Sequence, residues 1–367
     1  MQMRMITIME TLKKNKILLG LSGGVDSTAA VLLLKEKGFE VVGYYFDVLG
    51  NNEEGVKRAQ EVADQLGIEF IAEDVKNEFD RKVISNFCSE YSKGRTPNPC
   101  VVCNPNVKFK KLVENANKVG AYYIATGHYA RVIQDEQTRV FHVAKGVNER
   151  KDQSYMLYRL GQDVLSRLIL PLGEFDDKEK TRGIVRNQGI DNADAKDSQE
   201  ICFVDDDTNY EAFLEERGYK SAPGKFVDKD GKVLGDHKGI SSYTIGQRKG
   251  LGIALGKPAF VTEINSEKNT VTLGDNADLF KVRVISTDNV ITDKNLDLTK
   301  PVNVQGKIRY AAKPANCTII MIGKDLLEAI FEEPQRAATP GQSVVFYDGD
   351  LVVGGGFISE FNGESDK

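Results

Sequence analysis

At 367 residues the chain is longer than one hydrophobic core usually supports, so we expect two or three domains. The composition, 41% hydrophobic and 28% charged, is that of an ordinary globular protein and excludes a low-complexity chain. A net charge of −5 does not indicate nucleic-acid binding, although a local basic face can act within an acidic total.

No apolar stretch approaches the roughly 20 residues needed to span a bilayer. Residues 1–15 are polar and basic, and they lack the apolar centre of a secretory signal. We therefore expect a cytoplasmic protein that does not associate with membranes. Five cysteines are a sparse and odd set, which argues against a disulfide scaffold, and three histidines argue against a histidine-rich metal site.

Short apolar runs alternate with helical patterns between about residues 16 and 145. The expected strands are 17–21, 41–46, 68–71, 122–126 and 141–144, and the expected helices are 28–34, 56–66, 77–92 and 106–118. This alternation predicts an α/β fold with a doubly wound parallel sheet, in which ligands bind at the carboxyl ends of the strands.

The segment Ser22-Gly23-Gly24-Val25-Asp26-Ser27 joins the first expected strand to the first expected helix. Glycines let backbone N–H groups approach an anion, and the helix dipole attracts negative charge to the same place. The segment is not a Walker A loop, because the Gly-Lys-Ser/Thr ending is missing, and it is not a dinucleotide-binding G-x-G-x-x-G loop. A plain turn capped by Asp26 or Ser27 is the simpler alternative. The full pattern resembles the pyrophosphatase-type loop (PP-loop) of ATP enzymes that adenylate a substrate and release pyrophosphate.

The second half of the chain has a different pattern of expected secondary structure, with a few helices followed by many short strands. Helices are expected at 155–160, 178–188 and 210–218, and short strands at 259–264, 270–273, 302–310, 318–322, 327–331 and 343–347. Tight glycine turns separate these strands, which predicts a small β-rich module followed by a β-barrel. We place the domains at residues 1–212, 213–280 and 281–363.

Three cysteines stand in chemically suggestive positions. Cys100 and Cys103 have C-x-x-C spacing within a proline-containing segment, 96–104, that we expect to be a stiff loop, and Cys202 lies in a second loop-like segment. Thiols beside helix starts can have lowered pKa values and act as nucleophiles. Redox, zinc and catalytic roles stay open for one C-x-x-C pair, although no second pair completes a four-thiolate zinc site. Cys88 and Cys317 are expected to be core residues.

Several motifs then stand in one order along the chain. They are S-G-G-V-D-S at 22–27, T-P-N-P-x-x-x-C-N at 96–104, A-T-G-H-Y-A at 125–130, K-D-Q-S-Y at 151–155, I-C-F at 201–203, G-Q-R-K-G-L-G at 246–252 and T-P-G-Q-S at 339–343. Together, from Lys16 to Ile358, they resemble the bacterial tRNA-specific 2-thiouridylases, which thiolate the wobble uridine. The resemblance implies the PP-loop ATP pyrophosphatase fold, followed by a β-rich central domain and a C-terminal β-barrel.

The resemblance also implies a mechanism. ATP, with Mg²⁺, would adenylate the uracil O2, a persulfide on Cys202 would carry the sulfur, and Cys103 would be the nucleophile that releases it, leaving a Cys103–Cys202 disulfide. Asp26 would belong to the catalytic set. The implied ATP-binding residues are Gly20, Leu21, Ser22, Gly23, Gly24, Val25, Asp26, Ser27, Phe46 and Gly127.

Partners follow from the same resemblance. The substrate would be wobble-uridine tRNAs of the lysine, glutamate and glutamine type, the sulfur source a cysteine desulfurase or sulfur-relay protein, and the enzyme a monomer. The implied tRNA contacts are Asn98, Pro99, Cys100, His128, Lys151, Asp152, Gln153, Arg309, Tyr310 and Gln342. A continuous basic face is expected from Lys93, Arg95, Lys108, Lys110, Lys111, Arg131, Lys151, Arg248, Lys249, Arg309 and Lys313.

One position departs from the family pattern. Cys100 stands where the best-described members carry an aspartate that is proposed to act as a base. A thiol there can act as a base, as an alternative resolving thiol, or with Cys103 and Cys202 as a ligand of a [4Fe–4S] cluster. In the last case sulfide on the open iron would replace the persulfide as donor.

Two rival functions use the same ATP loop. An amidotransferase-type ligase would need an ammonia or amine route, and no segment resembles a glutaminase domain. A non-catalytic ATP-dependent RNA-binding module would not need Asp26, Ser27, Cys103 and Cys202 together. The thiolase interpretation accounts for both the loop and the thiols.

Overall fold

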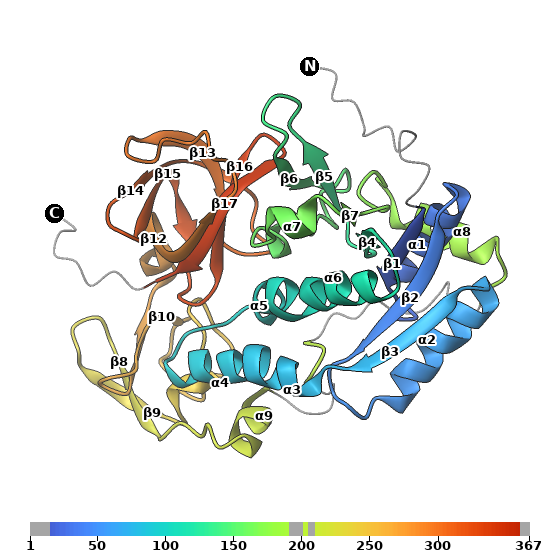
Figure 1. The fold of residues 1–367 in the computed structure, drawn as a ribbon. Coiled ribbons are helices and arrows are strands. Elements are labelled where there is room, and N and C mark those ends of the chain that lie inside the picture. The colour runs from blue at the N-terminus through green and yellow to red at the C-terminus, as the bar shows by residue number, and fades with distance from the viewer. Residues whose placement is uncertain (1–14, 191–200, 205–209, 360–367) are drawn as a thin grey trace. The chain divides into compact units, whose positions relative to one another are not determined.

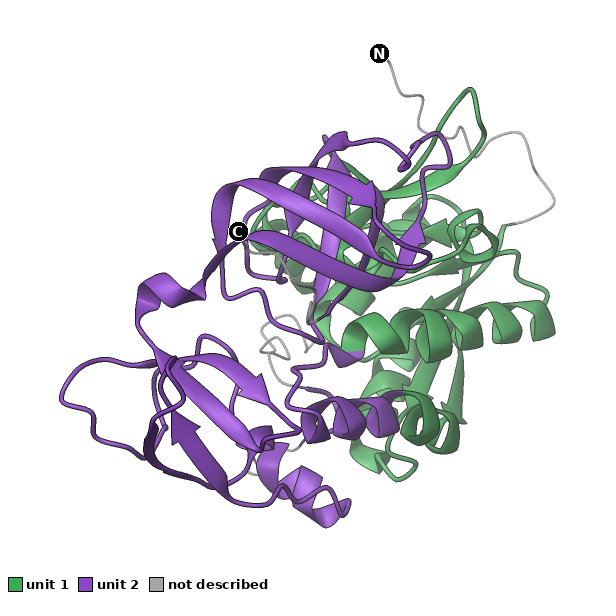
Figure 2. Ribbon diagram, turned by 90° about the vertical axis from the view of Figure 1, so that its left-hand side faces the viewer, with its two compact units in different colours: residues 1–82, 100–199, 350–352 green, residues 83–99, 200–349, 353–367 purple. Residues whose placement is uncertain are grey.

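The computed structural model describes residues 15–190, 201–204 and 210–359. It divides into two compact units (Figure 2). Unit 1 comprises residues 1–82, 100–199 and 350–352, and unit 2 comprises residues 83–99, 200–349 and 353–367. The chain therefore passes between the units several times.

Unit 1 is built on a five-stranded parallel sheet with the order β3-β2-β1-β4-β7. Its strands are β1 (Lys16–Gly20), β2 (Glu40–Asp47), β3 (Glu69–Asp74), β4 (Tyr123–Ala125) and β7 (Leu168–Ile169). Strand β1 is central in the sheet. Its carboxyl end, and the segment Ser22–Ser27 that follows (the glycine loop), therefore lie at the middle of one sheet edge (Figure 1). The expected doubly wound parallel sheet is confirmed.

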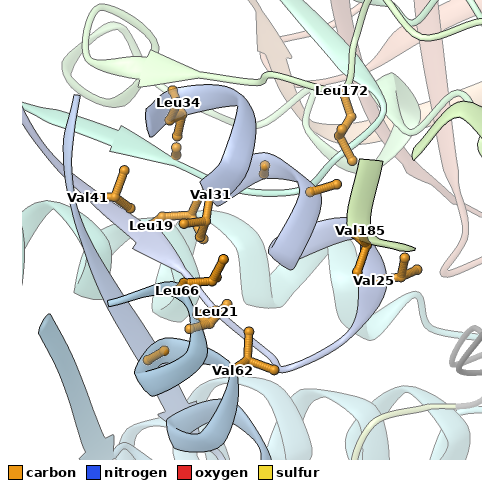
Figure 3. Close-up of a cluster of buried hydrophobic side chains, with 14 of the residues drawn as sticks. Leu19, Leu21, Val25, Val31, Leu34, Val41, Val62, Leu66, Leu172 and Val185 are labelled. Atoms are coloured by element: carbon orange, nitrogen blue, oxygen red, sulfur yellow. The ribbon is translucent and has the colours of Figure 1, made fainter. Parts of the chain in front are cut away.

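Helices α1 (Val25–Glu36), α2 (Glu53–Leu66) and α8 (Lys178–Arg186) share one buried core with β1 (Figure 3). Leu19 and Leu21 contribute from the strand side, while Val31 and Val62 contribute from α1 and α2. Helix α6 (Phe109–Lys118) packs against β1 and β4. The core therefore anchors both ends of the glycine loop, the strand before it and the helix after it.

The C-x-x-C segment differs from its expected form. It forms helix α5 (Pro99–Cys103), which continues through a π-helical turn at Asn104–Lys108 into α6. Pro99 is compatible with this because the first helical residue needs no N–H partner. The expectation of a stiff loop through residue 104 is wrong, and Cys100 and Cys103 lie one helical turn apart.

Smaller elements complete unit 1. A hairpin of β5 (Ala130–Gln134) and β6 (Phe141–Lys145) pairs with Leu351, and α3 (Lys76–Phe79) and α7 (Gln162–Leu165) are short helices. The helix expected at 155–160 is only a 3-10 turn at Ser154–Met156.

Unit 2 contains α4 (Ser85–Ser92), α9 (Tyr210–Glu216) and two β-structures. The first is a four-stranded sheet with the order β10-β11-β8-β9, made of β8 (Gly224–Val227), β9 (Val233–His237), β10 (Phe260–Asn265) and β11 (Thr270–Gly274). The second is a six-stranded barrel with the order β12-β15-β14-β13-β16-β17, closed by pairing of β12 with β17. Its strands are β12 (Phe280–Ile291), β13 (Val302–Lys307), β14 (Ala315–Met321), β15 (Leu327–Arg336), β16 (Ser343–Asp348) and β17 (Leu351–Ile358).

Each β-structure of unit 2 has its own core. Phe226 and Val261 lie in the core of the sheet, and Phe331 and Phe346 lie in the core of the barrel. The predicted β-rich module and C-terminal β-barrel are confirmed. Among the described residues, no helix has the length and apolar character that crossing a membrane requires.

Candidate nucleotide and thiol site

The glycine loop is braced by its own hydroxyl groups. The Ser27 Oγ donates to the Gly24 carbonyl oxygen at 2.9 Å and lies 3.2 Å from the Ser22 Oγ. The Ser22 N–H in turn donates to the Ser27 Oγ at 3.3 Å. Gly23 adopts a positive φ of 73°, which favours glycine. Within the described part of the chain, no side chain caps the N-terminus of α1 by a hydrogen bond. The loop therefore places the first N–H groups of α1 at the sheet edge, where an anionic ligand can accept from them.

Three other predicted ATP residues lie beside this loop. A Cβ added at Gly127 would be 2.8 Å from the carbonyl carbon of Asp26 and 2.9 Å from the amide nitrogen of Ser27. Only a glycine lets the chain after β4 approach the loop this closely. A Cβ added at Gly20 would lie 3.2 Å from Phe46, so the Phe46 ring packs beside the end of β1. The structure thus brings Gly20, Phe46 and Gly127 to the glycine loop.

Asp26 is held by two residues that were not predicted as site residues. The Tyr129 hydroxyl donates to Asp26 Oδ1 at 3.0 Å, and Lys178 Nζ lies 3.2 Å from Asp26 Oδ2. Tyr129 is buried and also hydrogen-bonds to Thr181 Oγ1 at 3.0 Å. Tyr129 directly follows the Gly-His pair that was singled out in the sequence. Nothing in the sequence marked Lys178, because its partner is 152 residues away.

The thiol of Cys103 is half-buried on α5, and Cys100 is exposed. Burial raises the pKa of Cys103, and the nearby Cys100 adds to the rise, while the Lys108 charge and backbone N–H partly oppose it. The lowered pKa that a thiol beside a helix start can have is therefore not found for Cys103. All five cysteines lie in the described residues, and none forms a disulfide there.

His128 shares its surroundings with this thiol. Burial lowers the pKa of His128 to about 3, and the Lys108 charge contributes to the shift. Its Nδ1 lies 2.6 Å from the Thr126 Oγ1, and its ring is 6.0 Å from that of Phe109 at the start of α6. His128 is therefore a neutral group that directly follows Gly127 and lies beside the start of α6.

The K-D-Q motif has an internal structural role. Asp152 is buried, and its carboxylate accepts from the Gly146 N–H, the Ser154 N–H and the Ser154 hydroxyl at 2.9–3.0 Å. The Gln153 Oε1 accepts from the Tyr129 N–H at 2.9 Å. The Asp152 and Gln153 side chains thus support the segment that holds Asp26, whereas the adjacent Lys151 is half-exposed.

In unit 2, Cys202 is exposed and lies in a turn over 201–204. The next residue, Phe203, is buried and packs edge-on against Phe87 at 5.2 Å and near Phe213 at 5.4 Å. The I-C-F motif therefore anchors one side chain in an aromatic cluster and presents the neighbouring thiol to solvent. Cys88 and Cys317 are buried, as expected.

The T-P-N-P and T-P-G-Q-S motifs meet within unit 2. The Gln342 side chain donates to the carbonyl oxygens of Thr96 at 2.9 Å and Pro97 at 3.2 Å, and the Thr96 N–H donates to the Pro340 carbonyl at 2.9 Å. Gly341 has a φ of 88°, and an added Cβ would lie 3.0 Å from the Thr96 carbonyl oxygen. These contacts hold the segment just before the C-x-x-C helix on the barrel.

Other predicted tRNA contacts lie in the same unit. Arg309 donates to the Ile245 carbonyl at 3.0 Å and to the Thr339 hydroxyl. Tyr310 is exposed, and Asn98 is buried. Arg309 therefore links the barrel to the segment before the G-Q-R-K-G-L-G motif.

The predicted basic face is reduced by ion pairs. Arg95 pairs with Glu90, Lys110 with Glu78, Lys111 with Glu73 and Glu78, and Arg131 with Asp350. The paired carboxylates cancel part of the positive charge that these side chains would present to a nucleic acid. In the described part of the chain, no group of three or more His, Cys, Asp or Glu side chains is arranged to hold a metal ion.

Three family models match the chain. They are described as the tRNA methyl transferase HUP domain at residues 15–206, the tRNA methyl transferase PRC-barrel domain at residues 211–275 and the aminomethyltransferase beta-barrel domain at residues 282–358. Together they span the described parallel sheet, the four-stranded sheet and the barrel.

Curated relatives match nearly the whole chain. The tRNA-specific 2-thiouridylase MnmA of Clostridioides difficile (strain 630) is 45% identical over 94% of this chain and 98% of that protein. The enzyme of the same name from Carboxydothermus hydrogenoformans is 45% identical over 96% of this chain and 100% of that protein. The enzyme of the same name from Acetivibrio thermocellus is 44% identical over 95% of this chain and 100% of that protein. With the family models and the site geometry, these likenesses show that the chain belongs to the MnmA family of tRNA-specific 2-thiouridylases.

Proposed function

We propose that the chain catalyses the ATP-dependent 2-thiolation of the wobble uridine, U34, of tRNA. One observation carries the proposal within unit 1. Lys108 acts on the pKa values of both Cys103 and His128, and Gly127, the neighbour of His128, packs directly on the glycine loop. These relations support our assignment of the anion-binding loop and the Cys103 thiol to one site, which is the combination that adenylation followed by sulfur transfer requires.

The chemistry has two steps. First, the uracil O2 attacks the α-phosphorus of ATP and pyrophosphate leaves, which makes the oxygen a good leaving group. Second, the Cys103 thiolate attacks the inner sulfur of a Cys202 persulfide, hydrosulfide is released onto C2, and AMP departs. The cysteines end as a disulfide, which a thiol reductant must reduce before the next cycle. Mg²⁺ would accompany the ATP phosphates, and Asp26 would supply a carboxylate near them.

Substrate binding would use both units. We assign tRNA contacts to Asn98, Pro99, Cys100, His128, Lys151, Arg309, Tyr310 and Gln342, with Asp152 and Gln153 acting through the backbone that they support. The target base would be extruded from its stack toward the glycine loop and the Cys103 thiol, because C2 must be reached directly. The proposal includes domains at 1–212, 213–280 and 281–363, a cytoplasmic monomer, and a cysteine desulfurase or relay protein as sulfur source.

The test is mass spectrometry of tRNA incubated with the enzyme, ATP, a persulfide donor and a reductant. We expect U34 to gain one sulfur in place of oxygen, and Cys103→Ser and Cys202→Ser to abolish the gain. Cys317→Ala, which changes a buried barrel cysteine, is the matched control and should retain activity. Unmodified U34 with the wild-type enzyme, or full activity in both serine variants, would contradict the proposal.

A second version of the reaction places a [4Fe–4S] cluster on Cys100, Cys103 and Cys202. The observation that favours it is that Cys100 and Cys103 occupy one turn of α5, with Cys100 close enough to influence the Cys103 pKa. Two thiolates at this spacing fit adjacent corners of a cluster. Anaerobic purification with iron and sulfide analysis distinguishes the versions: colourless, iron-free enzyme with full activity excludes the cluster.

A further inference from the structure

Gly23 of the glycine loop lies against the side chain of an arginine from another element. Gly23 packs on α2, and a Cβ added there would be 3.0 Å from Cγ of Arg58 and 3.1 Å from the amide nitrogen of Ala59. Because Gly23 has no side chain, the aliphatic part of the Arg58 side chain lies close against the loop at this point. Arg58 is exposed, and among the described residues it forms no ion pair or hydrogen bond.

The position of Arg58 on α2 follows from the helical pattern. Gly55, Ala59, Val62 and Ala63 form the buried stripe of α2, and Arg58 borders this stripe next to Ala59. The burial of Ala59 against the loop therefore fixes where the Arg58 stem begins. The preceding residue, Lys57, is exposed and pairs with Glu61 at 3.9 Å, so it provides a cation of the same helix with a different partner.

A second cation near the loop, Lys178, already forms an ion pair. Lys178 lies on Asp26 and is mostly buried, so its charge balances a carboxylate of the protein. The loop also lacks the lysine with which a Walker A loop binds β- and γ-phosphates. An ATP molecule on this loop carries several negative charges, and backbone N–H groups alone supply only partial charges in return.

We propose that Arg58 binds the β- and γ-phosphates of ATP and stabilises the pyrophosphate as it leaves. The proposal rests on the proposed ATP-dependent function and adds a residue to it. A guanidinium binds phosphate oxygens through paired N–H donors, and it suits an exposed site because it stays charged. Negative charge accumulates on the leaving pyrophosphate during adenylation, so the contact strengthens as the reaction proceeds.

The experiment compares Arg58→Gln, Arg58→Lys and Lys57→Gln in the full chain. Calorimetric titrations measure binding of ATP, inorganic pyrophosphate and AMP, each with Mg²⁺ at one salt concentration. We expect Arg58→Gln to weaken ATP and pyrophosphate binding about tenfold or more and to leave AMP binding unchanged. Arg58→Lys should lose less, and Lys57→Gln, with the same change in net charge, should bind all ligands as the wild type does.

A second measurement separates binding from chemistry. Pyrophosphate release during adenylation of tRNA should slow in Arg58→Gln even at saturating ATP, since the contact acts on the leaving group. Wild-type ATP and pyrophosphate affinities in Arg58→Gln, or an equal loss of AMP and ATP binding, would overturn the assignment. A wild-type chain that binds pyrophosphate but not ATP would contradict the proposed function, whereas an Arg58-dependent affinity for pyrophosphate would still support the assignment.

Discussion

Lys178 places its ammonium nitrogen 3.2 Å from the carboxylate of Asp26, at the start of the helix that follows the glycine loop. The Lys178 side chain is 12% exposed and that of Asp26 is 33% exposed, so water screens the pair only in part. The Tyr129 hydroxyl binds the other carboxylate oxygen. This pair therefore fixes the carboxylate that we assign to the adenylation step.

Replacing Lys178 should impair adenylation more than folding. In Lys178→Met the carboxylate loses its counter-ion and can rotate away, and we expect pyrophosphate release to slow about tenfold or more. Lys178→Arg should restore part of the rate. Lys180→Met is the control, since Lys180 pairs on the surface with Asp176. Wild-type kinetics in Lys178→Met would show that the pair is only structural.

Gly127 should tolerate no side chain. In Gly127→Ala the added methyl group meets the backbone of Asp26 and Ser27, which cannot move without displacing the loop. We expect ATP affinity to fall about tenfold or more, measured by calorimetry. Gly120→Ala is not a suitable control, because its φ of 71° strains any side chain. Gly183→Ala on α8, where an added Cβ meets nothing within 4 Å, should leave ATP binding intact.

Sulfur transfer should accelerate with rising pH. The pKa of Cys103 lies above that of an ordinary thiol because of burial, so most of the thiol is protonated at neutral pH and the thiolate fraction grows as pH rises. The rate of Cys103 alkylation, followed by peptide mass spectrometry, should keep rising between pH 6 and about 10. Lys108→Gln removes a charge that favours the thiolate and should move the profile to higher pH. A rate already at its plateau by pH 7 would contradict the raised pKa.

A polar network under α6 should contribute to stability. Glu73 accepts from Tyr44, from Asn115 at 2.6 Å and from Lys111 at 3.1 Å. Burial alone would raise the pKa of Glu73, but these hydrogen bonds outweigh it and hold the pKa below its usual value. Glu73→Gln should lower the free energy of unfolding by about 1–3 kcal/mol at pH 7.

The pH dependence of that difference has a definite sign. A carboxylate with a lowered folded-state pKa stabilises the protein above its unfolded-state pKa, about 4.3, and loses this contribution as the pH falls through the folded-state value. Denaturant unfolding should therefore show the gap between wild type and Glu73→Gln closing in acid. Glu69→Gln, which changes an exposed carboxylate of the same strand, should show a much smaller gap.

Gln342 should matter for tRNA thiolation and not for ATP binding. Its side chain holds the Thr96 and Pro97 carbonyl groups, which precede the thiol-bearing helix. In Gln342→Ala we expect the rate of tRNA thiolation to fall severalfold while the affinity for ATP stays unchanged. Gln335→Ala, on an exposed barrel strand, is the matched control. Equal loss in both variants would indicate a general weakening of the barrel.

Local sequence signals predicted much of the fold. The apolar runs of β1 and β2 and the spaced apolar residues of α2 follow the periods of strand and helix, so their positions were expected correctly. The closing strand β17 was not expected, because Gly354, Gly355 and Gly356 interrupt its apolar pattern. Added Cβ atoms at Gly354 and Gly356 would meet the Val290 and Thr287 carbonyl oxygens of β12 at 2.7 and 2.9 Å. These glycines let β12 approach and close the barrel, which no local pattern reveals.

The sequence by itself determined the chemistry that the chain can carry: a glycine loop between a strand and a helix, and thiols at Cys100, Cys103 and Cys202. These features depend on residues close together in the chain, where spacing and side-chain type are sufficient evidence. Only the tertiary structure decided that Lys178 and Tyr129 hold Asp26, that the Arg58 side chain lies beside Gly23, and that burial raises the pKa of Cys103. Those properties depend on distances between residues remote in sequence, and packing sets such distances.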